Sequence, residues 1–73
     1  MPFDPNFKPY DVESANEHIM RSELNLESWE NLVKTTDPRS EGYAAAFDGW
    51  LEAKQVLRQA REIERKLRQA GFK

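Results

Sequence analysis

Histidine and cysteine, which most often carry catalysis or bind transition metals, are almost absent from this chain. The sequence contains no cysteine, and His18 is its only histidine. Nucleophilic catalysis needs a base within hydrogen-bond reach of the nucleophile, and zinc sites need several thiolate or imidazole ligands. Because a lone histidine supplies neither arrangement, we interpret His18 as a solvated or interface residue. The sequence therefore predicts a protein that is not an enzyme and that uses no metal and no cofactor.

Glycine and glutamate also lack the spacing of a functional site. Phosphate-binding loops concentrate their glycines in one short loop, whereas the three glycines of this chain are scattered. The early glutamates have neither histidines beside them nor the paired spacing of metal ligands. We interpret them as one solvated helix face, made of Glu13, Glu17, Glu23, Glu27 and Glu30.

A row of arginines near the end of the chain is the strongest candidate for binding. The row recurs at spacings of 3, 4 and 3, which places it on one side of a helix, and consists of Arg58, Arg61, Arg65 and Arg68. This basic stripe could neutralise phosphates, contact an acidic protein surface, or only stabilise its own helix. The last alternative uses i,i+4 pairs of Arg58 with Glu62 and of Glu64 with Arg68.

The charges of the chain are divided between its two parts. Residues 1–53 carry four basic and eleven acidic side chains, whereas residues 54–73 carry seven basic and two acidic ones. The net charge of the whole chain is −2, which makes nucleic acid a less favoured partner than an acidic protein surface. Charge asymmetry of this kind concerns partners more than fold.

The arginines require a helix to position them, and the hydrophobic pattern predicts two long amphipathic helices. Over residues 11–35 a seam recurs at spacings of 3 and 4, namely Val12, Ala15, Ile19, Ser22, Leu26, Trp29 and Val33. Asp11 is placed to cap this helix. Asn25 is a second N-cap candidate, so the helix could be broken near residue 24; we favour one helix with a possible kink there.

The second helix is expected over residues 38–70. Thr35 and Thr36 end the first helix, and Asp37-Pro38 has the order of an N-cap followed by proline at the first helical position. At the other end Gly71 suits the left-handed conformation that often follows a helix, with Phe72 in contact with Leu67. The fold class is therefore all-α, a helical hairpin.

A stripe of small residues on the second helix predicts close packing of another helix. Its partner is either the first helix of the same chain or a second copy. Glycine within a helix costs about 1 kcal/mol relative to alanine, so Gly42 and Gly49 need such a contact. We take the following residues as the candidate dimer or partner interface: Gly42, Ala46, Gly49, Trp50, Ala53, Val56, Leu57, Ala60, Ile63 and Leu67.

Residues 1–10 are expected to form an extended N-terminal arm, followed by a single helical domain over residues 11–73. Three of the four prolines lie in the arm and disfavour a helix. Its aromatic residues Phe3, Phe7 and Tyr10 either cover apolar surface of the helices, or serve as a free motif for a partner, or belong to a disordered tail.

The size of the chain favours association with a second copy. With 73 residues and no cysteine, a single small core supplies only about 3–5 kcal/mol, and oligomerisation is the remaining means of stabilisation. A homodimer is therefore expected. No segment has the length and hydropathy of a membrane span or the order of a signal peptide, so we expect no membrane association and a cytoplasmic location.

Residues 28–53 carry short motifs that resemble those of small uncharacterised proteins encoded by bacteriophages and prophages. The motifs are Ser28-Trp29-Glu30, Asp37-Pro38-Arg39, and Phe47-Asp48-Gly49-Trp50 with Ala53. This sequence departs from the resemblance at Gly49-Trp50 and in its long basic C-terminal helix. The resemblance implies an accessory protein of a mobile element, of the kind that binds and blocks a host protein.

These observations lead to one function hypothesis and two alternatives. The leading hypothesis is a non-enzymatic helical interaction protein, a homodimer that binds and inhibits or modulates a host protein. The first alternative is a nucleic-acid-binding protein that uses the basic stripe. The second is a structural subunit of a larger assembly.

Overall fold

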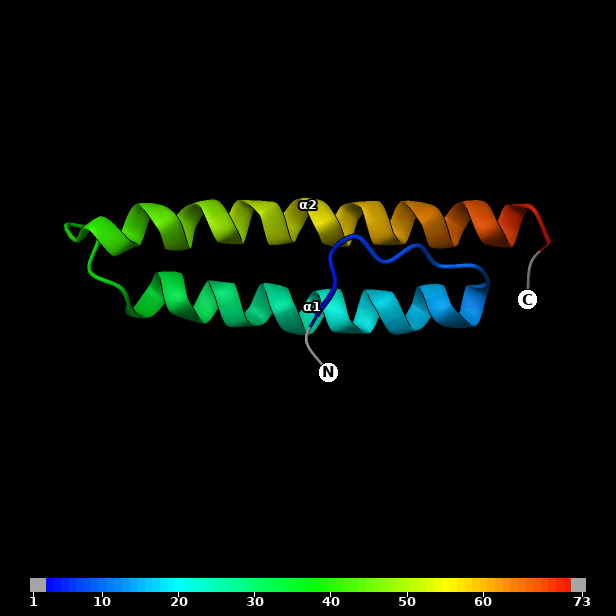
Figure 1. The fold of residues 1–73 in the computed structure, drawn as a ribbon, viewed down its shortest axis with the longest axis horizontal. Helices are drawn as coiled ribbons and strands as arrows, with labels where there is room; N and C mark the ends of the chain where they lie inside the picture. The colour runs from blue at the N-terminus through cyan, green and yellow to red at the C-terminus, as the bar shows by residue number, and fades with distance from the viewer. Residues whose placement is uncertain (1–2, 72–73) are drawn as a thin grey trace.

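The protein is an antiparallel hairpin of two long helices (Figure 1). The computed structural model describes residues 3–71. Helix α1 spans Val12–Thr35 and helix α2 spans Glu41–Gln69, and the described residues contain no strand. The molecule measures 49 × 21 × 16 Å, so it is a single layer of two helices. The predicted all-α helical hairpin is confirmed.

Helix α1 begins at the predicted cap. The Ser14 amide donates to Asp11 Oδ1 at 2.7 Å, and the Asp11 amide donates to Ser14 Oγ at 3.1 Å. This reciprocal arrangement is a capping box, which satisfies two amides that have no partner within the helix. The helix then runs without interruption through Asn25, so the alternative of a break near residue 24 is wrong. Both halves of the seam pack on the same long partner helix, which favours one continuous axis.

Helix α2 begins three residues later than predicted. The N-cap is Ser40, not Asp37, and Pro38 lies in a turn before the helix. The Ser40 amide donates to the Asp37 carbonyl oxygen at 2.9 Å, and the Arg39 amide donates to Asp37 Oδ1 at 2.9 Å. Aspartate followed by proline favours the first two positions of a type I turn as strongly as a helix start, and here the turn prevails.

The C-terminal end of α2 lies close to its predicted position. The helix ends at Gln69 with Ala70 as C-cap. Gly71 has a φ of 83°, the left-handed conformation that glycine adopts without steric cost. The predicted contact between Phe72 and Leu67 lies outside the described residues.

The predicted seams form the interface between the helices. All seven seam residues of α1 are buried or half-buried. Among the described residues the buried apolar side chains are Ala15, Ala46, Ala53, Leu57 and Ala60, of which all but Leu57 are small. Ser22 is also fully buried, and its hydroxyl donates to the His18 carbonyl oxygen at 2.7 Å, which satisfies its hydrogen-bonding capacity. Small side chains therefore allow α1 and α2 to approach closely.

Residues 3–10 precede α1 and run back alongside the hairpin toward its middle (Figure 1). A turn at Pro5-Asn6 redirects this N-terminal segment. In the turn, the Asn6 amide donates to Asp4 Oδ1 at 2.9 Å, and the Phe7 amide donates to the Asp4 carbonyl oxygen at 3.3 Å. The segment lies on one side of the hairpin, which leaves the other side open.

Candidate interaction surface

An aromatic cluster lies on α2 near the turn that joins the helices. The rings of Tyr43 and Phe47 are 6.2 Å apart, and those of Phe47 and Trp50 are 5.5 Å apart. Phe47 remains 37% exposed and the adjacent Leu51 is 46% exposed. Aromatic side chains packed on each other and open to water are the residue types that most often anchor protein partners.

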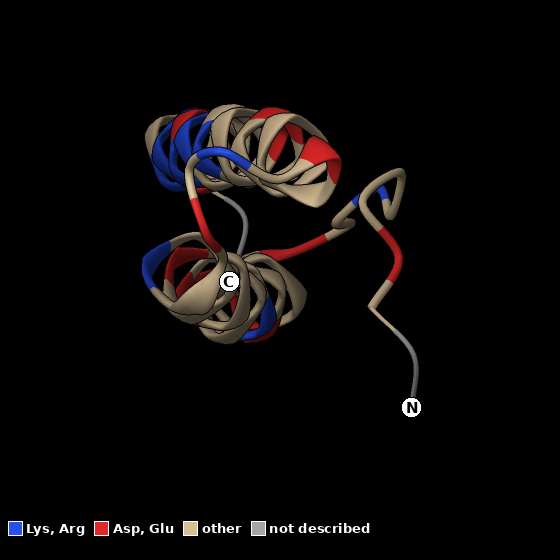
Figure 2. Ribbon diagram, turned by 90° about the vertical axis from the view of Figure 1, so that its left-hand side faces the viewer, with Lys and Arg blue, Asp and Glu red and all other residues tan. Residues whose placement is uncertain are grey.

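The basic residues of α2 continue along the same side of the helix. Lys54 Nζ lies 4.5 Å from the centroid of the Trp50 ring, a cation–π contact that connects the aromatic cluster to the basic stripe. Figure 2 shows the Lys and Arg residues of α2 on the side that faces away from the N-terminal segment. We define the aromatic–basic face as Tyr43, Phe47, Trp50, Leu51, Lys54, Arg58, Arg61 and Arg65.

Ion pairs engage part of the basic stripe. Arg61 Nη2 lies 3.3 Å from Glu23 Oε1 on α1, and Arg65 Nη2 lies 2.6 Å from Glu62 Oε1. The predicted pair of Arg68 with Glu64 is present. The predicted pair of Arg58 with Glu62 is not found among the described residues, because Glu62 is taken up by Arg65. These side chains are mostly exposed, so each pair contributes little stability.

A shallow hollow lies between the basic stripe and α1. Its volume is about 560 Å³, and Leu26 and Leu57 provide the apolar part of its lining. The charged part consists of Lys54, Arg58, Arg61, Glu62 and Arg65. A hollow with apolar and predominantly basic walls fits an apolar side chain flanked by carboxylates.

The predicted interface residues pack mainly on α1 of the same chain. This is one of the two alternatives that the sequence left open. Gly49 accommodates the indole of Trp29, since a Cβ built on Gly49 would lie 2.6 Å from Trp29 Cε3. Ala46, Ala53, Leu57 and Ala60 are buried, Gly42 is exposed, and the others are half-buried, namely Gly49, Trp50, Val56, Ile63 and Leu67.

An exposed apolar row on α1 was missed by the sequence analysis. Met20 is 64% exposed, Leu24 63% and Leu32 46%. Met20 and Leu24, four residues apart, form the row, whereas Leu32 lies about a third of a turn around the helix from Met20. All three fall outside the seam. The i,i+4 spacing of Met20 and Leu24 was the signal that could have found the row.

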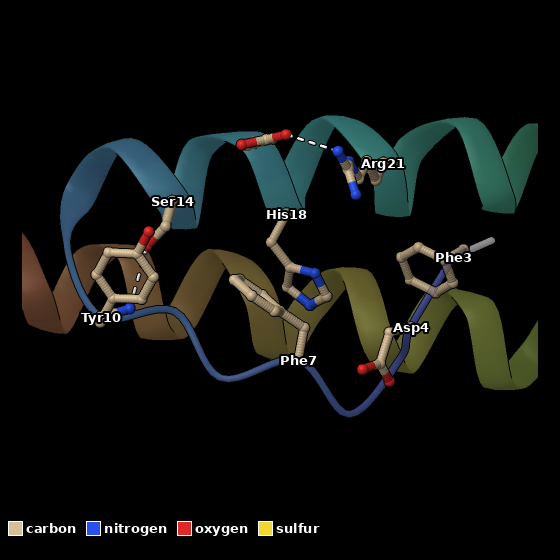
Figure 3. Close-up of a pocket in the computed structure, with 8 residues that line it drawn as sticks. Phe3, Asp4, Phe7, Tyr10, Ser14, His18 and Arg21 are labelled. Carbon is tan, nitrogen blue, oxygen red and sulfur yellow. Dashed lines mark hydrogen bonds and ion pairs between the residues drawn. The ribbon is translucent and has the colours of Figure 1, made fainter. Parts of the chain in front are cut away.

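A second site lies on the opposite side of the hairpin, where the N-terminal segment meets α1 (Figure 3). His18 points from α1 toward the segment and is only 5% exposed. The Phe3 ring stacks on the imidazole with centroids 5.8 Å apart, and the Phe7 ring lies 5.3 Å from it. Of the two alternatives predicted for His18, solvated or interface, the solvated one is therefore wrong. Its contacts with these two rings account for its burial.

The environment of His18 lowers its pKa below the usual value of 6.5. The main cause is desolvation by burial, which disfavours the imidazolium. The Arg21 guanidinium acts in the same direction, whereas the Asp4 carboxylate opposes it. His18 is consequently neutral at pH 7. Its position three residues after Ala15 and four before Ser22 places it beside the seam, which is the sequence signal for its burial.

Within residues 3–71, histidine, aspartate and glutamate side chains form no group of three that could hold a metal ion. Neither described helix combines the length and apolar character that crossing a membrane requires.

Comparisons with protein-family models, with curated proteins and with solved structures found no match to this chain.

Proposed function

We propose that this chain is a non-enzymatic interaction protein whose aromatic–basic face binds an acidic, amphipathic segment of another protein. The observation that carries the proposal is the continuity of that face. Exposed Phe47 and Leu51, the Trp50–Lys54 contact and the hollow beside Arg58 all lie on one side of α2. Apolar side chains of the partner would occupy the hollow and pack on the aromatic cluster.

Charge complementarity specifies the partner. The face presents Lys54 and the arginines of the basic stripe, so carboxylates on the partner would gain charge-assisted hydrogen bonds. The resemblance of residues 28–53 to phage-encoded proteins supplies the setting of the proposal: the partner is a host protein, whose activity the bound chain inhibits or modulates.

Nucleic acid fits this face less well than an acidic protein. Arg61 and Arg65 are already paired with Glu23 and Glu62, and these glutamates would stand close to any bound phosphate backbone. These glutamates would repel a polyanion. A phosphate backbone would also leave the apolar lining of the hollow, from Leu26 and Leu57, without a contact. Binding of nucleic acid by this face is therefore the alternative result that the experiment below must distinguish from binding of an acidic protein.

A charge-reversal pair tests the proposal. The Lys54→Glu/Arg58→Glu variant changes the face, and Lys8→Glu/Arg39→Glu makes the same charge change at exposed positions elsewhere. Each protein, together with the wild type, is immobilised and used to capture partners from a host lysate for mass spectrometry. We expect an acidic protein retained by the wild type and by the control, and lost from the face variant.

Binding of that captured protein, once purified, is then measured by titration. The face variant should weaken it about tenfold or more, and added salt should weaken it further. Equal retention by all three proteins would contradict the proposal. So would a gel shift of single-stranded nucleic acid that the face variant abolishes while protein capture is unaffected.

We also propose that two copies of the chain associate through the exposed apolar row of α1. The supporting observation is the small interior, in which four of the five buried apolar residues within residues 3–71 are alanines. A second copy covering Met20 and Leu24 would bury additional apolar surface, at about 25 cal/mol per Å². Light scattering after size exclusion should give a dimer for the wild type and a monomer for Leu24→Glu. A wild-type monomer would remove this part of the proposal without affecting the aromatic–basic face.

A further inference from the structure

The pocket beneath the N-terminal segment lies on the side of the hairpin opposite the aromatic–basic face. It is a half-open cavity of about 390 Å³, large enough for a small organic molecule. Three aromatic rings and five polar or charged side chains surround it, and all come from the segment and α1: Phe3, Asp4, Phe7, Tyr10, Ser14, Glu17, His18 and Arg21. The proposed partner surface contributes none of these residues, so this site stands independently of the proposed function.

Two polar groups that border the pocket are already satisfied within the protein. The Ser14 hydroxyl accepts from the Tyr10 and Asp11 amides, both at 3.1 Å, and donates to the Asp11 carbonyl oxygen at 3.0 Å. Arg21 Nη2 lies 2.7 Å from Glu17 Oε1, so these two charges neutralise each other. Neither Ser14 nor the Arg21–Glu17 pair requires a ligand.

The imidazole of His18 has no hydrogen-bond partner among residues 3–71, although the residue is 95% removed from solvent, with 5% exposed. Its ring nitrogens nevertheless keep contact with solvent, because every fully enclosed side-chain nitrogen or oxygen of the described residues has a hydrogen-bond partner. Figure 3 shows the ring directed into the pocket between Phe3 and Phe7. The imidazole nitrogens therefore have no partner within the described part of the chain and are open, from the pocket, to a ligand that can hydrogen-bond with them.

The charges around the pocket decide the sign of that ligand. With Arg21 and Glu17 paired, the Asp4 carboxylate remains, and it is near enough to His18 to raise the imidazole pKa against the larger effect of burial. Since burial keeps His18 neutral, one ring nitrogen carries a lone pair that accepts a proton donor. A negatively charged pocket with an open acceptor selects a cation that bears N–H groups.

We propose that this pocket binds a primary ammonium group, which donates to the His18 imidazole, is neutralised by the Asp4 carboxylate and rests its carbon chain against Phe3 and Phe7. Aromatic faces attract cations through their quadrupole, so the rings contribute to the charge as well as to the carbon chain. The ammonium belongs either to a free alkylamine or to a lysine side chain.

Proton NMR provides a direct test, because His18 is the only histidine and its ring signals are unambiguous. The full chain is titrated at neutral pH and constant ionic strength with n-butylammonium chloride, tetramethylammonium chloride or sodium butyrate. We expect a saturable shift of the His18 ring signals with n-butylammonium alone. Tetramethylammonium has the charge without an N–H donor, and butyrate has the carbon chain with the opposite charge.

Two substitutions of the same kind provide the matched control. Asp4→Asn removes the charge that faces the ligand and should weaken n-butylammonium binding about tenfold. Asp48→Asn makes the same change on the exposed surface of α2 and should leave the affinity unaltered. Far-UV circular dichroism confirms that each variant retains its helices, and a ligand-observed saturation-transfer measurement supplies a second readout.

The proposal is overturned if n-butylammonium causes no saturable shift, if tetramethylammonium or butyrate causes the same shift, or if both aspartate variants bind alike. The source of the ammonium follows from a comparison with Nα-acetyl-lysine amide. Tighter binding of this compound than of n-butylammonium assigns the site to a lysine side chain. The reverse order assigns it to a free amine.

Discussion

Two glycines of α2 have opposite surroundings, although the sequence gives both the same role. Gly49 lies against the Trp29 indole, whereas a Cβ added to Gly42 would meet nothing within 4 Å. The small-residue stripe therefore predicted a close approach correctly at Gly49 and incorrectly at Gly42. Sequence spacing places a residue on a helix face, but it does not indicate where along that face a large side chain of the other helix will cross.

Alanine substitutions at these glycines should change stability in opposite directions. Gly49→Ala gains helix propensity but forces Trp29 to move, and overpacking of this kind costs about 1–3 kcal/mol. We therefore expect it to lower the free energy of unfolding. Gly42→Ala should raise that free energy by about 0.5 kcal/mol. Urea unfolding followed by circular dichroism measures both, and a stable Gly49→Ala variant would contradict the packing of Trp29.

The burial of His18 predicts a pH dependence of stability. Its pKa in the folded protein is lowered from 6.5, so the unfolded chain binds more protons in the interval between the two values. The stability that the folded protein has with a neutral His18 is complete above pH 6.5, and it is lost as the pH falls through 6.5 toward the pKa of His18 in the folded protein. The free energy of unfolding should therefore decrease over this interval.

Comparison with a His18→Gln variant isolates this effect from the titration of carboxylates. Unfolding is measured at pH about 7.5 and about 5.5, where the histidine is the main group that changes. The decrease in the wild type should exceed that in the variant. Equal decreases would show that His18 titrates normally and is not buried by the aromatic rings.

At the scale of the elements, the two aspartates that precede the helices perform different tasks. Asp11 caps α1, whereas Asp37 stabilises the turn before α2. Both were predicted to be N-caps, and only Asp11 is. The existence of both helices could be predicted from hydrophobic periodicity over many residues. The start of α2 could not, because Asp37-Pro38 satisfies a type I turn and a helix start equally.

Removal of the Asp11 cap should weaken the whole hairpin. Asp11→Ala leaves the Ser14 amide without its partner and should lower the free energy of unfolding by about 1 kcal/mol. Asp48→Ala, at an exposed position within α2, serves as the control and should have little effect. Thermal unfolding of the two variants under identical conditions measures the difference, and similar melting temperatures would argue against the capping box.

At the scale of the whole molecule, the face that each helix presents followed from the sequence, but the arrangement of the sites did not. The seams and the basic stripe have helical spacing, so the sequence alone could assign each of them to one face of its helix. The N-terminal segment has no periodicity, so its position on the side opposite the aromatic–basic face could not be derived. The pocket at His18 depends on that position and was therefore not predicted.

The proposed dimer makes thermal stability depend on concentration. If two copies share the apolar row of α1, mass action favours the folded dimer as the chain becomes more concentrated. The melting temperature of the wild type should then rise over a hundredfold range of concentration, and that of Leu24→Glu should remain constant. A constant melting temperature for both proteins would indicate that the hairpin is stable as a monomer.

The alanine-lined interface between α1 and α2 also restricts how this protein can evolve. A larger residue at Ala53 or Ala60 would act as a wedge, because both side chains are almost fully enclosed. Wedging the helices apart would separate Arg61 from Glu23 and widen the hollow between Leu26 and Leu57. The distances between side chains on the outer surface thus depend on how closely the two helices pack. New binding specificities are therefore more accessible through substitutions of surface residues than through substitutions of the buried alanines.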